Sequence, residues 1–260
     1  MFKMNQKKSN IWLMGGLGNQ LFQFNLALSL IEKDITVDLV TNLCFKNFLT
    51  SKILRWNIHD FIFDVVIDYP IVSKSTTYAI YVSSISKMPF FNYFSSFELN
   101  KDLVSYNTLG YHQILDQIGL NDFSYYLRND LFLDKNLDFG DAEWVMHLRF
   151  GDAPNMANNI QYYNKVLEFI GDDSILFCTD SFSTAEKWLK GNGRSNFRIL
   201  SLDTLLSFKY LLNAKNLAIA PSTFSWWAAA LGDNKRKIVS PIQLHSLNVY
   251  LINQKRLVEI

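Results

Sequence analysis

Hydrophobic and polar residues follow a regular pattern near the N-terminus of the chain. The apolar run in residues 9–14 predicts a strand, residues 15–20 a turn, and residues 21–33 a helix with apolar residues on one side. Residues 35–40 are rich in β-formers and predict a second strand. This order of elements predicts a parallel βαβ unit. Residues 41–136 are aromatic-rich and irregular, and they show no repeat.

From residue 144 onward, short apolar runs alternate with segments of helical periodicity. The runs predict strands at residues 144–146, 175–178, 197–200, 217–220 and 237–240, with Pro241 closing the last strand. The periodic segments predict helices at residues 161–170, 184–190, 203–213 and 224–231. This alternation predicts a second parallel, doubly wound sheet. The polar stretch 130–141 predicts a boundary between two domains, residues 1–136 and 137–260.

Polar residues stand at the ends of three of these strands. They are His147 and Arg149, Thr179 and Asp180, and Ser222 and Thr223. The carboxyl ends of parallel strands meet at one edge of a sheet, where open α/β sheets bind ligands. We therefore expect these residues to converge on one crevice. Taken alone, residues 147–152 are equally compatible with an ordinary polar turn.

Two features predict an anion site at this edge. The planar guanidinium of Arg149 suits a diphosphate. Residues 222–227 open a helix that Ser222 or Thr223 would cap, and the hydroxyls and the positive helix end would attract a phosphate. The alternative is that these residues only cap the helix and that the two following tryptophans belong to the core. The two interpretations are compatible.

Three further polar side chains fit a nucleotide site. His147 could hydrogen-bond a base or a phosphate, and Asp180 could bind ribose hydroxyls or the N–H groups of a base. Asp152 could orient Arg149 or accept a proton. Each could also be an ordinary surface residue, and it is their joint position at strand ends that favours a site.

Residues 16–21 (Gly-Leu-Gly-Asn-Gln-Leu) lie between the first predicted strand and its helix. They resemble a dinucleotide-binding fingerprint in which Leu21 takes the third glycine position, and Asp38 stands where an acidic residue would bind a ribose. A NAD-dependent dehydrogenase is therefore one alternative. A glycine turn at a helix start also presents backbone N–H groups to an anion or a sugar oxygen. A tight turn without a ligand is the remaining interpretation.

Composition and charge limit the classes of function and the partners that we expect for the chain. The 260 residues have a formal net charge of +1 and no block of like charge, so no nucleic-acid partner is expected. Residues 1–10 lack the apolar segment of a signal peptide, and no stretch reaches the ~20 apolar residues of a membrane span. Cys44 and Cys178, far apart, predict reduced thiols in a cytoplasmic protein. No two aspartates stand two positions apart, so the metal-holding Asp-x-Asp pair of many sugar-nucleotide transferases is missing and no metal is expected.

Three ordered stretches together resemble the α-1,2-fucosyltransferases of glycosyltransferase family 11. Residues 15–24 (Gly-Gly-Leu-Gly-Asn-Gln-Leu-Phe-Gln-Phe) are similar to the N-terminal signature of that family. Residues 147–152 resemble its His-x-Arg-Arg-Gly-Asp motif, and residues 222–229 its Ser-Ser-Phe-Ser-Trp-Trp-Gly-Ala block. Residues 177–180 stand where the family carries Phe-Ser-Asp-Asp. The resemblance extends over about residues 11–240.

The resemblance implies an α/β, GT-B-like fold with two Rossmann-like lobes and a cleft between them. Residues 1–136 would form the acceptor side, and residues 137–260 would bind a GDP-sugar. The implied enzyme is an inverting, metal-independent hexosyltransferase that needs no cofactor. It would move L-fucose from GDP-L-fucose to a galactose-type hydroxyl, the 2-OH, in a surface glycan such as O-antigen.

The resemblance also implies roles for individual residues. Arg149 would bind the donor diphosphate and stabilise the leaving GDP. The reaction itself calls for a carboxylate as general base, for which Asp152 is the candidate, and the alternatives are Asp38, another acidic residue of the N-terminal lobe, or a reaction without a dedicated base. The residues implied to line the donor site are His147, Asp180, Ser222, Thr223, Phe224 and Ser225. The residues implied to approach the donor sugar or the acceptor are Gly16, Gly18, Asn19 and Gln20.

The chain departs from the family pattern at several positions. Phe150 replaces the second arginine of the motif, so we expect a less electropositive pocket in which Arg149 acts more alone. Residues 178–180 keep one aspartate of the usual pair, and Asn216 and Pro221 stand where the family has His and Asn. Because of these departures, a deoxy relative of GDP-fucose such as GDP-colitose is a second candidate for the donor. They also keep a non-catalytic sugar-nucleotide or glycan-binding protein among the alternatives.

The expected partners follow from the implied reaction. They are the GDP-sugar donor and a glycan or lipid-linked oligosaccharide acceptor. A lipid-linked acceptor would bring a cytoplasmic protein into peripheral contact with the inner membrane. The aromatic-rich residues 78–99 would contribute to that contact, or else form core or a subunit interface.

Overall fold

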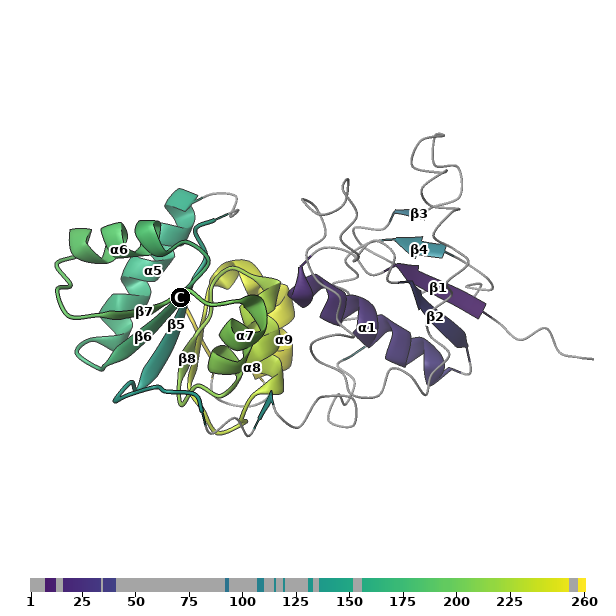
Figure 1. Ribbon diagram of the computed structural model, residues 1–260. Helices are drawn as coiled ribbons and strands as arrows, with labels where there is room; N and C mark the ends of the chain where they lie inside the picture. The colour runs from purple at the N-terminus through teal and green to yellow at the C-terminus, as the bar shows by residue number, and fades with distance from the viewer. Residues whose placement is uncertain are drawn as a thin grey trace, which may run out of the picture. The chain divides into compact units, whose positions relative to one another are not determined.

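The fold is taken from a computed structural model, which is drawn in Figure 1. It describes residues 8–12, 16–33, 35–40, 92–93, 107–109, 115, 119, 131–132, 136–151, 156–252 and 257–260. The chain divides into two compact units, Met1–Arg128 and Asn129–Ile260. Each unit contains a parallel sheet with helices, so the α/β prediction is confirmed. In the part of the chain that the structure describes, no helix is long and apolar enough to cross a membrane.

The first unit contains the predicted βαβ arrangement. Its elements are β1 (Lys8–Trp12), α1 (Leu17–Ile31), β2 (Thr36–Val40), β3 (Asn92–Tyr93) and β4 (Asn107–Leu109), and the strand order is β2-β1-β4-β3. All strand pairs are parallel, with Ile11 opposite Leu39 in β1 and β2. The helix begins at Leu17, inside the stretch predicted as a turn. It is buried on nearly all sides, so it lacks the polar face that would have marked its first turn.

The second unit contains one six-stranded parallel sheet. Its strands are β5 (Trp144–Leu148), β6 (Ile175–Thr179), β7 (Arg198–Leu200), β8 (Leu217–Ala218), β9 (Ile238–Ser240) and β10 (Leu257–Glu259). Its helices are α5 (Met156–Ile170), α6 (Phe182–Gly191), α7 (Thr204–Leu212), α8 (Thr223–Leu231), the 3-10 turn η3 (Ile242–Leu244) and α9 (His245–Ile252). The strand order is β10-β9-β8-β5-β6-β7. The predicted doubly wound sheet is therefore confirmed.

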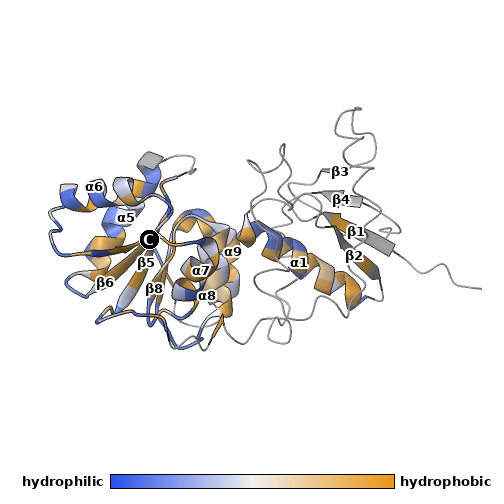
Figure 2. Cartoon of the chain, viewed as in Figure 1, coloured by the Kyte–Doolittle hydropathy of each residue, from blue (hydrophilic) through white to orange (hydrophobic). Residues whose placement is uncertain are grey.

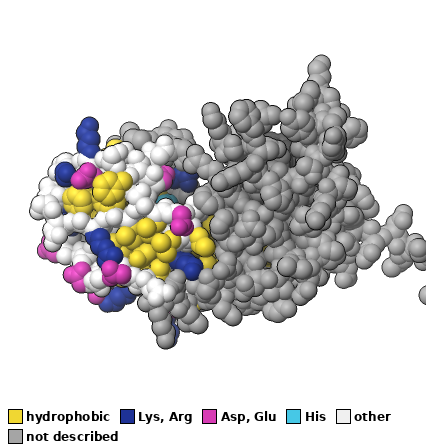
Figure 3. All heavy atoms as spheres, viewed as in Figure 1, with side chains coloured by type: hydrophobic (Ala, Val, Ile, Leu, Met, Phe, Trp, Pro, Cys, Tyr) yellow, Lys and Arg dark blue, Asp and Glu magenta, His cyan; other side chains and the backbone are white. Residues whose placement is uncertain are grey.

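Helices cover both faces of this sheet. Figure 1 shows α5 and α6 on one face and α7, α8 and α9 on the other. The core under α5 and α6 includes Trp144, Met146 and Leu148 from β5 and Tyr163 from α5. Figure 2 shows hydrophilic residues on α6 and hydrophobic ones in β6, as expected for a surface helix and a strand buried on both faces. The exposed side of this unit in Figure 3 carries hydrophobic side chains among both signs of charge.

A buried arginine holds α7 and α8 together. Arg236 Nη1 donates to the backbone oxygens of Leu211 and Leu212 at 2.8 and 2.9 Å, and its Nη2 donates to the oxygen of Ala228. These oxygens lie in the C-terminal turns of the two helices, where a cation is favourable. A Cβ on Gly232 would collide with this guanidinium, so a glycine is needed at this position. The contact fixes the end of α8 that lies away from the strand edge.

The predicted end of the sheet is wrong. The strand predicted for residues 237–240 is β9, which does end before Pro241, but it is not the last strand, because η3, α9 and β10 follow. The backbone N–H of Ile260 donates to the oxygen of Ser240 at 3.0 Å, and Val258 lies opposite Val239. Pro241 follows the end of β9 and is also the N-cap of η3, so the proline marks the end of one strand and not the end of the sheet. Other bounds differ as well: β5 continues to Leu148, so His147 lies inside the strand, α5 begins at Met156, and β8 ends at Ala218.

Candidate functional site

The candidate site lies where the strand order of the second sheet reverses. The chain leaves β5 towards β6 on one side, and β8 lies on the other side of β5. The helices that follow β5 and β8 cover opposite faces of the sheet, so their starts separate at this point. Open α/β sheets bind ligands in this position. Arg149 and Asp180 directly follow β5 and β6, and Ser222 lies in the connection between β8 and α8.

Arg149 and Ser222 are in direct contact. Arg149 Nη1 donates to Ser222 Oγ at 2.9 Å. Ser222 is the N-cap of α8, and its Oγ also accepts the backbone N–H of Phe224 at 3.3 Å. Thr223 is the first residue of the helix. A guanidinium at the positive end of a helix concentrates positive potential, so the predicted convergence of the first and third strand ends produces a place for an anion.

Asp180 holds the backbone of the loop after β5. Its Oδ1 accepts the N–H groups of Phe150 and Gly151 at 2.8 and 3.0 Å. A Cβ on Gly151 would lie 3.0 Å from Asp180 Oδ2, so the glycine permits this close approach. Asp180 is exposed, and its Oδ2 accepts from no residue that the structure describes. The carboxylate therefore braces the loop and keeps one oxygen at the surface.

His147 is a buried, neutral imidazole at this edge. Only 6% of the residue is exposed, and its ring lies 5.6 Å from the ring of Phe224. Burial, together with a smaller contribution from the charge of Arg149, lowers the pKa of His147 to about 3. Its Nδ1 is buried and has no hydrogen-bond partner among the described residues. His147 can therefore offer a hydrogen bond, whereas Arg149 supplies the charge.

Ser225 and the two tryptophans of the block are interior residues. Ser225 is fully buried and its Oγ donates to the backbone oxygens of Ala220 and Ser222, both at 3.3 Å. It also accepts the N–H of Ala220 at 3.2 Å. These bonds fix the turn between β8 and α8. Trp226 and Trp227 are fully buried with their rings at 85°, as predicted for core residues.

Phe150 belongs to the core and not to the Arg149 side of the loop. It is 2% exposed, and its ring lies 5.5 Å from that of Tyr163 and 6.1 Å from that of Trp188. Alternating residues of an extended segment point to opposite faces, which places Phe150 with Leu148 under α5 and Arg149 on the other side. The structure therefore places Phe150 in an aromatic cluster, and the expected loss of positive charge from the pocket stays a prediction.

Tyr163 is a functional candidate that the sequence did not reveal. Its Oη accepts the backbone N–H of Arg149 at 2.9 Å. The sequence showed only a tyrosine near a helix start. No spacing rule connects a helix residue to the amide of a residue that precedes the helix by a loop.

The predicted glycine turn of the first unit has two accessible positions. Gly16 is the exposed N-cap of α1, and its backbone oxygen accepts the N–H groups of Asn19 and Gln20 at 3.0 and 3.2 Å. Asn19 is partly exposed, whereas Gly18 and Gln20 are buried. Asp152 and the side chain of Asp38, the two proposed bases, lie outside the described residues. Among the side chains that are described, no group of three His, Cys, Asp or Glu is placed to hold a metal ion.

Comparison with known proteins finds similarity only at the level of solved structures. No family model matches the sequence. No curated protein matches it either.

The similar structures include a heptosyltransferase, a glycosyltransferase and POFUT1 in complex with GDP-fucose. The E. coli heptosyltransferase WaaC with ADP is 11% identical, with 90% of this chain and 87% of that chain covered and a TM-score of 0.45. POFUT1 in complex with GDP-fucose is 14% identical, with 90% and 97% covered and a TM-score of 0.44. The iron-containing dodecameric glycosyltransferase TibC from enterotoxigenic E. coli is 9% identical, with 91% and 58% covered and a TM-score of 0.45. At TM-scores below 0.5 these similarities do not decide a family.

Proposed function

We propose that the chain is an inverting GT-B-type glycosyltransferase that uses a GDP-sugar, GDP-L-fucose or a deoxy relative such as GDP-colitose. The observation that carries the proposal is the hydrogen bond of Arg149 to Ser222 at the start of α8, where the strand order reverses. A cation and a helix N-terminus side by side suit the diphosphate of a nucleotide sugar. The ordered fucosyltransferase-like motifs supply the residues of this arrangement.

The proposed reaction needs charge stabilisation at the leaving group. An acceptor hydroxyl attacks the anomeric carbon in line, and GDP leaves from the opposite face through an oxocarbenium-like transition state. Negative charge grows on the β-phosphate as the bond breaks. We assign its stabilisation to the Arg149 guanidinium, which is bonded to Ser222, and to the backbone N–H groups at the start of α8. We therefore propose that the reaction needs neither a metal ion nor a cofactor.

The neutral state of His147 adds a specific role. A second charged group at this edge would strengthen binding of both substrate and product diphosphates, whereas a neutral imidazole contributes one hydrogen bond. The pKa of about 3 keeps His147 uncharged at physiological pH. We propose that His147 recognises a donor atom by hydrogen bonding and leaves the charge on Arg149.

The acceptor side of the proposal comes from the family resemblance. The acceptor would be the 2-OH of a galactose-type sugar in a surface glycan such as O-antigen, free or lipid-linked. Asp152 is proposed as the general base, with Asp38 as the alternative. A lipid-linked acceptor would place the protein at the cytoplasmic side of the inner membrane.

Product analysis with a panel of donors and acceptors tests the proposal. Purified protein is incubated with GDP-fucose or GDP-colitose and β-galactosides, with and without EDTA, and products are analysed by mass spectrometry and NMR. We expect one sugar to be transferred with inversion, equally with EDTA. UDP-galactose and NAD serve as control ligands in calorimetry. Binding of GDP without transfer or donor hydrolysis would identify a binding protein, and binding of NAD in place of GDP would identify a dehydrogenase.

A further inference from the structure

The loop that carries Arg149 has three consecutive backbone N–H groups with fixed partners. The N–H of Arg149 donates to Tyr163 Oη, and the next two N–H groups donate to Asp180 Oδ1, all within 3.0 Å. Loop amides usually find water or their own turn, whereas these three are held by side chains from α5 and from the end of β6. The direction in which Arg149 leaves the loop is therefore set by other elements.

Tyr163 is the rigid partner in this arrangement. It is fully buried, and its ring packs edge-on against Phe150 at 5.5 Å and Trp188 at 5.8 Å. Trp188 is itself held by a hydrogen bond from its Nε1 to Asn164 Oδ1 at 3.2 Å. An aromatic ring in a close-packed core has little freedom, so the position of its hydroxyl is defined. The loop amide is thus tied to the core and not to a mobile surface group.

Phe150 completes the attachment. It is the residue after Arg149, and its ring enters the cluster formed by Tyr163 and Trp188. Because neighbouring residues of an extended chain point to opposite sides, burying Phe150 directs Arg149 towards Ser222. The departure from the two-arginine motif therefore places an aromatic anchor behind the remaining arginine.

We propose that Tyr163 is a positioning residue for the donor diphosphate, acting through the backbone of Arg149. This inference rests on the proposed GDP-sugar site. The hydroxyl of Tyr163 and the ring of Phe150 hold the guanidinium in the place where it meets Ser222 before the donor binds, so that binding does not have to order it. Tyr163 itself does not touch the donor.

The chain offers a matched control for this role. Tyr162 is the preceding residue of α5 and is also buried, with 4% exposed. Its hydroxyl donates to the backbone oxygens of Ile219 and Val239 at 2.7 and 3.3 Å, and so ties α5 to β9 and the end of β8. Tyr162→Phe and Tyr163→Phe each remove one buried hydroxyl from the same helix. Only the second removes the partner of the Arg149 amide.

The test compares the two variants in the full chain by calorimetry with GDP. Loss of one positioning hydrogen bond should weaken GDP binding about fivefold in Tyr163→Phe. Tyr162→Phe should bind GDP like the wild type, although both variants lose thermal stability. In an Arg149→Ala background, Tyr163→Phe should have no further effect on GDP affinity, because the arginine that it positions is gone. Equal effects of the two tyrosine variants, or an undiminished effect of Tyr163→Phe without Arg149, would overturn the inference.

Amide hydrogen exchange separates this inference from the proposed function. The amide of Arg149 should exchange faster in Tyr163→Phe than in the wild type and in Tyr162→Phe. If the wild type binds no GDP, the proposed function falls. In that case unchanged exchange at residue 149 would overturn the bracing by Tyr163, and faster exchange there would uphold it.

Discussion

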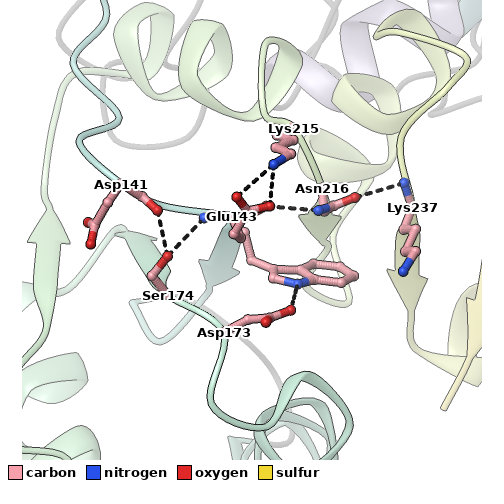
Figure 4. Close-up of polar contacts among 8 residues, drawn as sticks. Asp141, Glu143, Asp173, Ser174, Lys215, Asn216 and Lys237 are labelled. Atoms are coloured by element: carbon pink, nitrogen blue, oxygen red, sulfur yellow. Dashed lines mark hydrogen bonds and ion pairs between the residues drawn. The ribbon is translucent and has the colours of Figure 1, made fainter.

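The two ends of the second sheet use polar residues differently. At the amino ends of the strands, Asn216 donates to the backbone oxygen of Glu143 at 2.9 Å and accepts the N–H of Lys237 at 3.2 Å (Figure 4). Ser174 Oγ donates to the oxygen of Asp141 at 2.6 Å and accepts the N–H of Glu143 at 3.1 Å. The nearby pairs are Trp144 with Asp173 and Lys215 with Glu143. These groups bond to one another and hold the strand starts in register.

At the carboxyl ends of the strands, two polar atoms have no hydrogen-bond partner among the described residues. Asp180 Oδ2 accepts from no described residue, and His147 Nδ1 is buried without a hydrogen-bond partner among them. A buried polar atom that lacks a partner costs stability. We therefore propose that the carboxyl end of this sheet binds a ligand, whereas the polar groups of the amino end contribute stability. Asn216, which departs from the family pattern, belongs to the amino end.

The largest expected effect comes from substitutions that remove one cation at each end of the sheet. Arg149→Ala should lower sugar transfer by about 100-fold or more, because the developing phosphate charge loses its partner. Lys215→Ala removes the cation of an exposed ion pair at the amino end and should leave transfer unchanged and stability within about 1 kcal/mol. Transfer rates and melting temperatures are measured for both. Near-normal transfer by Arg149→Ala would end the distinction between the two ends.

A second, smaller effect concerns acid stability through His147. Its pKa is about 3 in the folded protein and about 6.5 when unfolded, so the unfolded chain binds the proton first. Stability should therefore be complete above pH 6.5 and decrease as the pH falls towards 3, by about 2 kcal/mol at pH 5. His147→Gln should remove this part of the pH dependence. Urea unfolding of both proteins at neutral pH and at about pH 5 measures it, and parallel pH profiles would contradict the buried neutral imidazole.

The smallest expected effect comes from a pair of serines, one at each end of the sheet. Ser222→Ala removes the cap of α8 and should cost about 1 kcal/mol of stability. Ser174→Ala removes two backbone contacts at the amino end and should cost a similar amount. Only Ser222→Ala should also weaken GDP binding, by several-fold, because Arg149 loses its partner. Calorimetry with GDP distinguishes them, and equal affinities would place Ser222 with the structural serines.

Much of the second unit could be predicted from sequence because its periodicity is unbroken. Asp203 caps α7 by accepting the N–H of Leu206 at 2.8 Å, and short apolar runs mark buried parallel strands. The convergence of Arg149 and Ser222 followed from strand direction alone. The start of α1 could not be predicted from the sequence, because Gly18, Asn19 and Gln20 have the composition of a turn and yet lie in a buried helix. Tertiary burial overrode local propensity there.

The contacts within the site were less accessible to sequence reasoning. A motif comparison reads Phe150 as a missing cation, and only the direction of its side chain shows that it packs against Tyr163. Asp180 was predicted to bind a ligand, and its bonds to two loop amides depend on the distance between two strand ends. Such contacts depend on three-dimensional positions that no spacing in the sequence encodes.

The strand order of the second sheet has a consequence for synthesis on the ribosome. The central strand β5 emerges first, and each later strand finds an open edge: β6 and β7 extend one side, then β8, β9 and β10 extend the other. No strand has to insert between two that are already paired. Among the strands that the structure describes in the first sheet, β3 pairs with β4, which is made later, so β3 must wait for this neighbour. The second sheet can therefore grow during translation, strand by strand, with little exposure of unpaired edges.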